Sequence, residues 1–216
     1  MTSSVLTFDE LNSLNDGNYN RRSEPYKEYF DKMSISDKQK KLRIAFSEKM
    51  EEVILYAMSL MIVMVESDQI DKEYVQNKII EEYLAIASSM EITIDDYVQD
   101  YVKTFASEIV ETTLKRTNES YYLSKDRAMV IAECEANTSI NYQNYVDAVK
   151  SGKKYKTWVD IQDSRERPTH REVGGTTIPI DEPFAVGGGL MNFPHDTSYG
   201  CSSSEIVNCR CSVKYS

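Results

Sequence analysis

The chain has 216 residues, of which 41% are hydrophobic and 28% are charged, a composition typical of a globular protein and not of a disordered tail. Its longest apolar run, Val53 to Val65, lies between Glu52 and Glu66 and is too short to cross a bilayer. We therefore expect no membrane partner. The N-terminus has no basic residues followed by an apolar stretch, so we also expect no secretory signal.

The formal charge of -10 is unevenly distributed along the chain. Residues 1–150 contain 17 Lys and Arg against 27 Asp and Glu, whereas residues 151–216 contain eight of each kind. An acidic surface repels the phosphate backbone of DNA, so the first 150 residues favour docking on other proteins. A weak DNA contact would depend on four lysines near residue 150, whose alternative role is that of solvated charges beside a linker: Lys150, Lys153, Lys154 and Lys156.

Helix-forming residues dominate the N-terminal two thirds of the chain. Residues 1–24 are rich in Asn, Ser and Asp and predict a flexible arm. Apolar residues then recur at three- and four-residue spacing, which predicts a helical region over 25–123, arranged as a bundle or a long antiparallel set. The expected helices cover residues 36–66, 68–87, 93–114 and 124–150.

After Lys150, the spacing of apolar residues changes from a helical pattern to an alternating one. Alternating apolar residues predict strands over 154–161, 176–181 and 206–215, and we interpret Gly187–Leu190 as an irregular loop. The expected fold class is α+β, with a mainly helical N-terminal region followed by a small C-terminal α+β module of short antiparallel strands over 124–216. Residues 158–216 hold the only Trp, both His, three of the four Cys and six of the eight Gly.

The cysteines near the C-terminus form a candidate metal site. In an extended strand, residues 209 and 211 face the same side, so the sulfurs of Cys209 and Cys211 would point together. With Cys201 and either His170 or His195, they would supply the four soft ligands of a structural zinc. Two other interpretations stay open, namely reduced cysteines packed as small apolar residues and a disulfide that involves Cys201.

A second candidate site lies between residues 163 and 170. Asp163, Arg165, Arg167 and His170 are clustered there, as in a metal-dependent hydrolase or nuclease centred on Asp163, His170 and Cys209. The structural alternative is a salt-bridged turn in which Asp163 accepts from backbone amides, Arg165 pairs with a carboxylate such as Glu205, and His170 donates to a carbonyl. The chain lacks the phosphate-binding glycine loop and the common motifs of serine hydrolases and zinc proteases.

Taken as an ordered set, these residues resemble the phage Mu protein F-like head morphogenesis family, the minor head proteins of tailed phages. The similarity covers about residues 125–216. The matching pieces in chain order are Ile131–Asn137, Lys156–Trp158, Asp163–Arg165, Arg167, His170, Gly174 or Gly175, Phe184, Pro194 and Glu205–Cys211.

The resemblance implies a virion protein of the phage head, assembled in the host cytoplasm and acting in head morphogenesis, genome packaging or ejection. Its implied partners are the portal protein and the major capsid or scaffolding protein, and it implies no enzymatic activity. The implied structural residues are Glu135, Trp158, Asp163, Arg165, His170, Glu205 and Asn208, with Glu135 tying the last helix to the module. Related modules occur fused to toxins, but this chain ends five residues after Cys211, so we expect no toxin domain.

Two departures from the family pattern affect these expectations. Some relatives carry a pair of cysteines where this chain has Arg167 and His170, and a guanidinium cannot replace a metal ligand. A zinc site here would therefore use His170, Cys209, Cys211 and one residue from outside the motif, Cys201 or His195. Relatives also commonly show Arg-Thr before Glu135, where this chain has Glu133 and Cys134.

Overall fold

The computed structural model describes residues 25–216, so the predicted N-terminal arm lies outside the described residues. Packing divides these residues into two compact units, the first formed by 46–132 and the second by 25–45 together with 133–216. Two long helices, α3 (Asp37–Ser67) and α6 (Lys125–Lys150), contribute residues to both units. The domain limits expected at residues 24 and 123 stay predictions.

The first unit is helical, as the spacing of apolar residues predicts. It combines parts of α3 and α6 with α4 (Lys72–Ser89), α5 (Asp96–Lys115) and a short 3-10 helix, η1 (Ser120–Leu123). Side-chain caps fix the starts of the helices, because Asp71 accepts the amide of Tyr74 and Asp95 accepts that of Val98. The third helix therefore begins at its cap Asp95, two residues later than the start expected at Thr93.

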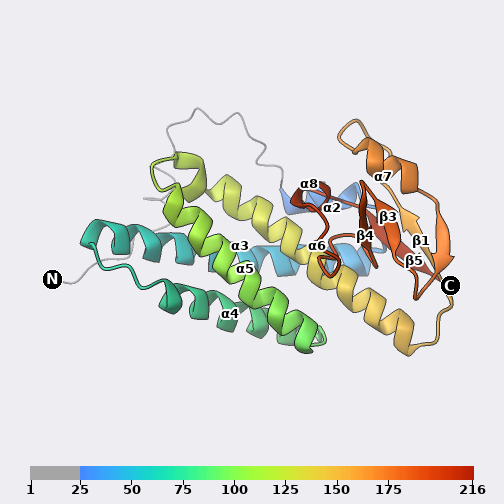
Figure 1. Cartoon of the computed structure of the whole chain (residues 1–216), viewed down its shortest axis with the longest axis horizontal. Helices are drawn as coiled ribbons and strands as arrows, with labels where there is room; N and C mark the ends of the chain where they lie inside the picture. Colours follow the sequence, from blue (N-terminus) through green and yellow to red (C-terminus); the bar gives the residue numbers. More distant parts are fainter. Residues whose placement is uncertain (1–24) are drawn as a thin grey trace. The chain divides into compact units, whose positions relative to one another are not determined.

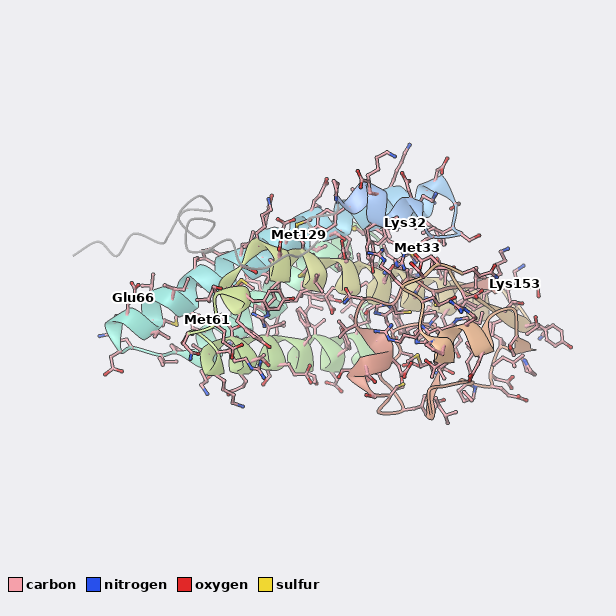
Figure 2. All side chains as sticks on the ribbon, turned by 90° about the horizontal axis from the view of Figure 1, so that it is seen from above. Lys32, Met33, Met61, Glu66, Met129 and Lys153 are labelled. Carbon is pink, nitrogen blue, oxygen red and sulfur yellow. The ribbon has the colours of Figure 1, made fainter. Side chains whose placement is uncertain are left out.

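Apolar and aromatic side chains fill the first unit. Tyr83 of α4 packs edge-on against Phe46 and Phe105, with ring centroids 5.7 and 5.5 Å apart. Met61 of α3 lies inward among the helices, whereas Glu66 near the end of the same helix is exposed (Figure 2). In the described part of the chain, no helix combines the length and the hydrophobicity that a membrane span requires.

The second unit contains two small antiparallel sheets beside short helices (Figure 1). β1 (Tyr155–Val159) lies between β2 (Thr177–Pro179) and β5 (Ser212–Tyr215), and β3 (Phe184–Val186) pairs with β4 (Gly189–Met191). The register places Trp158 opposite Val213, so the two ends of the C-terminal module meet. The helices of this unit besides α3 and α6 are α2 (Tyr26–Asp31), α7 (Pro168–Val173) and α8 (Ser203–Ile206). These elements confirm the α+β fold class.

Two predicted elements of the C-terminal module are wrong in part. The strand expected over 206–215 covers only Ser212–Tyr215, because α8 ends at Ile206 and Asn208 adopts a left-handed backbone with φ of +59°. The loop expected at Gly187–Leu190 is instead part of the β3–β4 hairpin. Gly187 and Gly188 form its turn with positive φ, and Gly189 and Leu190 begin β4.

Candidate functional site

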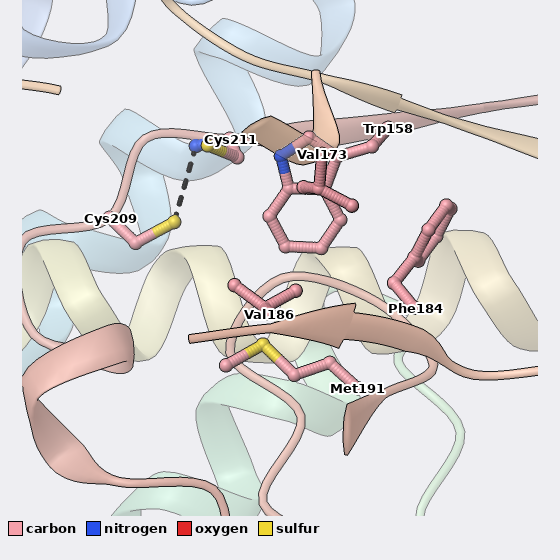
Figure 3. Packing of buried hydrophobic residues seen from close by; sticks show 7 residues of the cluster. All are labelled: Trp158, Val173, Phe184, Val186, Met191, Cys209 and Cys211. Carbon is pink, nitrogen blue, oxygen red and sulfur yellow. Dashed lines mark hydrogen bonds between the residues drawn. The ribbon is translucent and has the colours of Figure 1, made fainter. Parts of the chain in front are cut away.

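Trp158 is the centre of the hydrophobic core of the second unit (Figure 3). Its side chain is fully buried and meets Phe184 edge-on at 5.2 Å between ring centroids and His170 at 5.7 Å. Cys209 and Cys211 belong to the same core cluster. The fold therefore brings the two halves of the predicted motif, on either side of residue 190, into one buried cluster.

His170 and two cysteines form a compact group inside this core. The Nδ1 atom of His170 lies 3.5 Å from Cys209 Sγ and 3.4 Å from Cys211 Sγ. All three ligand atoms lie within 4.8 Å of one another, and all three residues are buried. Cys211 also donates its backbone N–H to Cys209 Sγ at 3.4 Å, an interaction drawn in Figure 3.

The two sulfurs converge for a reason other than the predicted one. Residues 209 and 211 lie in the irregular segment between the turn at 207–208 and β5, so their common direction does not come from a paired strand. The expected bond from His170 to a carbonyl is also wrong, because one ring nitrogen faces the sulfurs and the other faces Glu205. The core packing of Trp158 fixes the plane of this ring.

Glu205 of α8 completes the surroundings of His170. Its Oε2 lies 3.1 Å from His170 Nε2, at an angle outside that of a regular hydrogen bond, and accepts from Thr169 Oγ1 at 2.8 Å. Gly187 leaves the space for this carboxylate, since a Cβ at that position would lie 2.4 Å from Glu205 Cδ. The glycine turn of the β3–β4 hairpin is thus tied to the position of Glu205.

The electrostatic state of the group follows from burial and from mutual hydrogen bonding. Burial alone would raise the pKa of Cys209, but hydrogen bonds from Cys211, His170 and His195 hold that pKa well below its ordinary value. The hydrogen bond to Cys209 and burial together raise the pKa of Cys211. Burial lowers the pKa of His170, but the hydrogen bond with Cys209 and the charges of Cys209 and Glu205 together leave that pKa raised above its ordinary value. Cys209 is therefore the sulfur that becomes a thiolate first.

Asp163 accepts from a backbone amide, as in the turn predicted as one alternative, but the salt bridge of this turn joins Asp163 to Arg210. Its Oδ1 accepts the backbone N–H of Arg165 at 2.9 Å, and its Oδ2 lies 2.7 Å from Arg210 Nη1. The hydrogen bond from Arg210 lowers the pKa of Asp163 below its ordinary value. Arg210, buried except for 5% of its surface, thus anchors the loop after β1 to the turn that carries both cysteines.

A buried arginine, which the sequence analysis did not select, stabilises the segment with the two cysteines through hydrogen bonds to two asparagines. Arg43 of α3 is fully buried and donates to Asn137 Oδ1 at 2.8 Å and to Asn141 Oδ1 at 2.7 Å. Each of these amide groups also donates a hydrogen bond of 3.2 Å to a backbone carbonyl, Asn137 to that of Cys209 and Asn141 to that of Pro194. Arg43 is thereby connected to the segment that carries the cysteines.

Burial lowers the pKa of Arg43 to about 9, so its guanidinium stays protonated at neutral pH. In the sequence, Arg43 and the two asparagines have the appearance of ordinary polar positions on helix surfaces. The one available signal was the run of small and polar residues from Asn137 to Asn141 in the middle of a predicted helix.

Lys156 of β1 is a second buried cation that the sequence did not identify. It is fully buried, donates to the carbonyl of Asn192 at 2.9 Å and lies 5.2 Å from the ring centroids of Tyr145 and Phe184. Burial lowers its pKa to about 8. The lysine predicted as a solvated charge or DNA contact is therefore a structural residue of the core.

A small pocket opens beside the cysteines. Its cavity volume is about 10 Å³, close to the space that one water molecule requires. Its lining includes His170, Cys209 and Cys211 together with Asn208 and three arginines, Arg165, Arg167 and Arg210. Asn208 Oδ1 is buried without a hydrogen-bond partner. The pocket can accommodate an ion or a water, but not a bulky substrate.

The remaining predicted site residues occupy other positions. Cys201 packs against the core cluster next to Gly189 but is not one of the three residues grouped around His170 Nδ1. His195 is fully buried, and its Nε2 lies 2.8 Å from the carbonyl of Cys209. Glu135 is buried on α6, and its role in tying that helix to the module stays a prediction.

Comparisons with known proteins identify the family to which the sequence is similar. The sequence model of a family described as phage Mu protein F like protein matches residues 98–214, more than half of the chain, and begins inside α5. A curated relative, the NAD(+)--arginine ADP-ribosyltransferase EFV of Enterococcus faecalis, is 32% identical over 100 residues. That alignment covers 44% of this chain and 20% of the relative, so the chain spans about a fifth of the relative's length. No solved structure gives a significant match.

Proposed function

The chain belongs to the phage Mu protein F like family, and on this premise we propose that it is a minor head protein that acts in head morphogenesis through protein contacts. Membership makes it a phage head-related protein with a place in the virion. The finer role proposed here is association with the portal or the inner capsid during assembly in the host cytoplasm, at the stage of genome packaging or ejection.

The observation that carries this proposal is the extent of the family match. It includes most of α5, all of α6, both sheets and the turn with the two cysteines. A match to an isolated metal-binding turn would support only a local resemblance. Here the matched segment runs through helical and sheet elements in one continuous order, as expected when an entire structural module is shared.

The proposed docking partner is a portal, major capsid or scaffolding protein that presents basic or polar surface to the first unit. Residues 46–132 hold eight Lys and Arg against 17 Asp and Glu, whereas residues 25–45 and 133–216 are nearly balanced. Charge of one sign steers a partner of the other sign and repels DNA. Weak DNA contact would then be confined to the lysines near residue 150, of which Lys156 is buried.

A non-enzymatic role is supported by the condition of the residues that a hydrolase would use. Asp163 already accepts from Arg210 and from the amide of Arg165, so its oxygens are occupied in the turn. Cys209 is 98% buried beside a cavity of about 10 Å³. A metal-dependent hydrolase or nuclease centred on Asp163, His170 and Cys209 needs an open approach for its substrate, and these contacts argue against one.

The named activity of the enterococcal relative gives no basis for an enzymatic role in this chain. The shared 100 residues are a fifth of that protein, and its name refers to the whole. A shared module attached to different neighbours is common among proteins, and activity follows the residues of a site and not the module alone.

The direct test is association with the phage head. The full chain, tagged and co-expressed with the portal protein of the same phage, is expected to elute with the portal ring in size-exclusion chromatography. Mass spectrometry of purified virions should detect it in few copies. A chain that elutes alone beside portal and procapsid, and that is absent from virions, would contradict the proposal.

Charge reversal on the first unit tests how the chain docks. Three glutamates there are exposed, namely Glu73, Glu82 and Glu108. Their replacement by lysine should weaken portal binding by about tenfold or more, because each reversed charge turns attraction into repulsion.

The matched control places the same change in charge on the second unit, at Glu28, Glu172 and Glu182, which are also exposed. This variant should bind the portal like the unmodified chain. Binding of the unmodified chain should also weaken as salt rises from 0.05 to about 0.5 M. Equal losses in the two triple variants would contradict docking through the acidic unit.

A further inference from the structure

We propose that His170, Cys209 and Cys211 form a zinc site that stabilises the second unit, with Glu205 orienting the histidine. The site is independent of the head-protein role, because it concerns how the C-terminal module is held together and not which partner it meets. Two sulfurs and one imidazole form the kind of ligand set that zinc takes in structural sites.

The distances between the ligand atoms fit a shared ion. Zinc bonds of about 2.3 Å to sulfur and about 2.0 Å to nitrogen, at tetrahedral angles, place a nitrogen and a sulfur about 3.5 Å apart. His170 Nδ1 lies 3.5 Å from one sulfur and 3.4 Å from the other. Both distances from His170 to the sulfurs therefore match those of a zinc site.

Hydrogen bonding alone satisfies this group incompletely. An imidazole nitrogen carries either one hydrogen or one lone pair in its plane, so Nδ1 can pair well with one sulfur but not with two. Both sulfurs nevertheless approach it at the same distance inside a core that is closed to bulk water. A cation placed among the three atoms would satisfy all of them at once.

The surroundings of His170 supply a second, independent feature of a metal site. Metal-binding histidines usually turn their other ring nitrogen to a carboxylate, which fixes the tautomer and the ring orientation. Glu205 Oε2 lies 3.1 Å from His170 Nε2, and Thr169 holds that oxygen from the other side at 2.8 Å. A proton on Nε2 leaves the lone pair on Nδ1, the atom that faces the sulfurs.

A backbone hydrogen bond to the sulfur of Cys209 favours the thiolate form that binds a metal. The N–H of Cys211 points to it at 3.4 Å, and a donor aimed at a thiolate sulfur stabilises its negative charge. The contact lies in the irregular segment that follows the turn at residues 207 and 208, where both sulfurs face the same histidine.

The fourth position faces the pocket of about 10 Å³, in whose wall Asn208 lies. Asn208 Oδ1 is a buried acceptor for which the structure shows no hydrogen-bond partner, so its lone pairs can meet a metal ion or a metal-bound water. We assign the fourth position to this oxygen, directly or through one water. Cys201, expected from the sequence as a ligand, is not in the group.

The experiment measures metal bound to the full chain purified under reducing conditions. Elemental analysis is expected to give about one zinc per chain. Cobalt in place of zinc should give the intense visible bands of a tetrahedral ion and the near-ultraviolet band of thiolate ligation. A chain that binds neither metal, or cobalt spectra without the thiolate band, would overturn the proposal.

Substitutions assign the ligands. Cys209→Ser, Cys211→Ser and His170→Ala should each reduce zinc affinity by at least 100-fold, whereas Cys201→Ser and Cys134→Ser, which also remove one thiol each, should leave it within twofold. Equal losses in the Cys201 and Cys209 variants would overturn the assignment. Each variant is compared by circular dichroism, so that loss of the fold is distinguished from loss of a ligand.

One further variant and one measurement on the unmodified chain keep the test decisive if the ligand variants fail to fold. Glu205→Gln retains all three ligands and should weaken zinc binding by about 10- to 100-fold. A chelator should lower the melting temperature of the unmodified chain, and added zinc should restore it. Chelator-insensitive melting together with unchanged affinity in Glu205→Gln would refute the site.

The fourth ligand is tested at residue 208. Glycine tolerates the positive φ of this position, so Asn208→Gly removes the amide with little backbone strain. It should weaken zinc binding, and Asn208→Asp, which presents a charged oxygen, should strengthen it. Unchanged affinity in both variants would overturn the role of Asn208.

Discussion

The two compact units are held together by different kinds of interaction. In the first unit, buried side chains are mostly apolar, and charged residues with an excess of acid occupy the surface. In the second unit, total charge is nearly balanced but polar groups are inside. Of the 18 buried polar or charged side chains in the described part of the chain, 13 belong to the second unit.

This difference indicates which unit depends on individual residues. An apolar core tolerates substitution, because exchange of one apolar side chain for another of similar volume changes the free energy of unfolding only slightly. Removal of one partner of a buried polar group lowers the free energy of unfolding strongly, because water cannot reach the group that is left unpaired. The second unit should therefore be sensitive to single changes of chemistry, and the first mainly to changes of volume.

The strongest way to break the second unit is to remove the centre of its core. Trp158→Ala should reduce the free energy of unfolding by about 3–5 kcal/mol, because the fully buried indole leaves a cavity that its neighbours cannot fill. Urea unfolding followed by circular dichroism measures the loss. Tyr155→Ala on the same strand, at a side chain that is 53% exposed, is the control and should cost less than about 1 kcal/mol.

The contrast between polar and apolar cores is sharpened by one substitution in each unit. Arg43→Met keeps much of the volume but leaves the side-chain oxygens of Asn137 and Asn141 without their donor, at a cost of about 2–4 kcal/mol. Met58→Leu in the buried core of the first unit should cost less than about 1.5 kcal/mol. Similar losses in the two variants, measured by urea unfolding, would remove the proposed distinction.

A smaller effect is expected at the hairpin turn that makes room for Glu205. Gly187→Ala combines a positive φ with a Cβ contact of 2.4 Å to that carboxylate and should destabilise the chain by about 2–3 kcal/mol. Gly188→Ala has a positive φ with nothing within 4 Å and should cost only about 1 kcal/mol. The difference in melting temperature between the two variants measures the contact. Equal shifts would mean that Glu205 moves away freely.

The smallest expected effect is the pH dependence of the turn at Asp163. Its pKa in the folded chain is lowered by the hydrogen bond from Arg210, so the turn is stabilised above the unfolded pKa of about 3.9. This stabilisation is lost as pH falls through the lower, folded pKa. Because Asp163 is partly exposed, Asp163→Asn should cost only about 1 kcal/mol at pH 7 and nothing near pH 3.

The measurement is the melting temperature between pH 7 and pH 3 for the unmodified chain and the variant. Their difference should be constant above about pH 5 and then shrink as the solution becomes more acidic. Glu172→Gln, which changes an exposed carboxylate on α7, should follow the unmodified chain at every pH. A difference that persists undiminished at pH 3 would contradict the role of the Asp163 charge.

The candidate site could be predicted from the sequence only in outline. His170, Cys209 and Cys211 were identified because imidazole and thiol groups are rare in this chain and cluster in its last third. Cys201 was included on the same grounds, but chemistry alone does not tell which thiol lies near the histidine. That choice depends on the positive-φ turn at Asn208 and on the direction of α7.

The residues that sequence reasoning missed share one physical property. Arg43, Asn137, Asn141 and Lys156 are polar, and polar residues in helices and edge positions are usually exposed. Their burial depends on partners up to 98 residues away in the chain, such as the pair Arg43 and Asn141. Local spacing carries no information about such partners.

The sequence by itself determined the helices, the acidic character of the first 150 residues, the α+β class and the family, because periodicity, charge and ordered motifs are properties of the chain alone. Only the tertiary structure decided which polar side chains are inside and which two thiols face His170. A buried polar group is stabilised solely by the atoms that surround it, and those atoms come together only when the chain has folded.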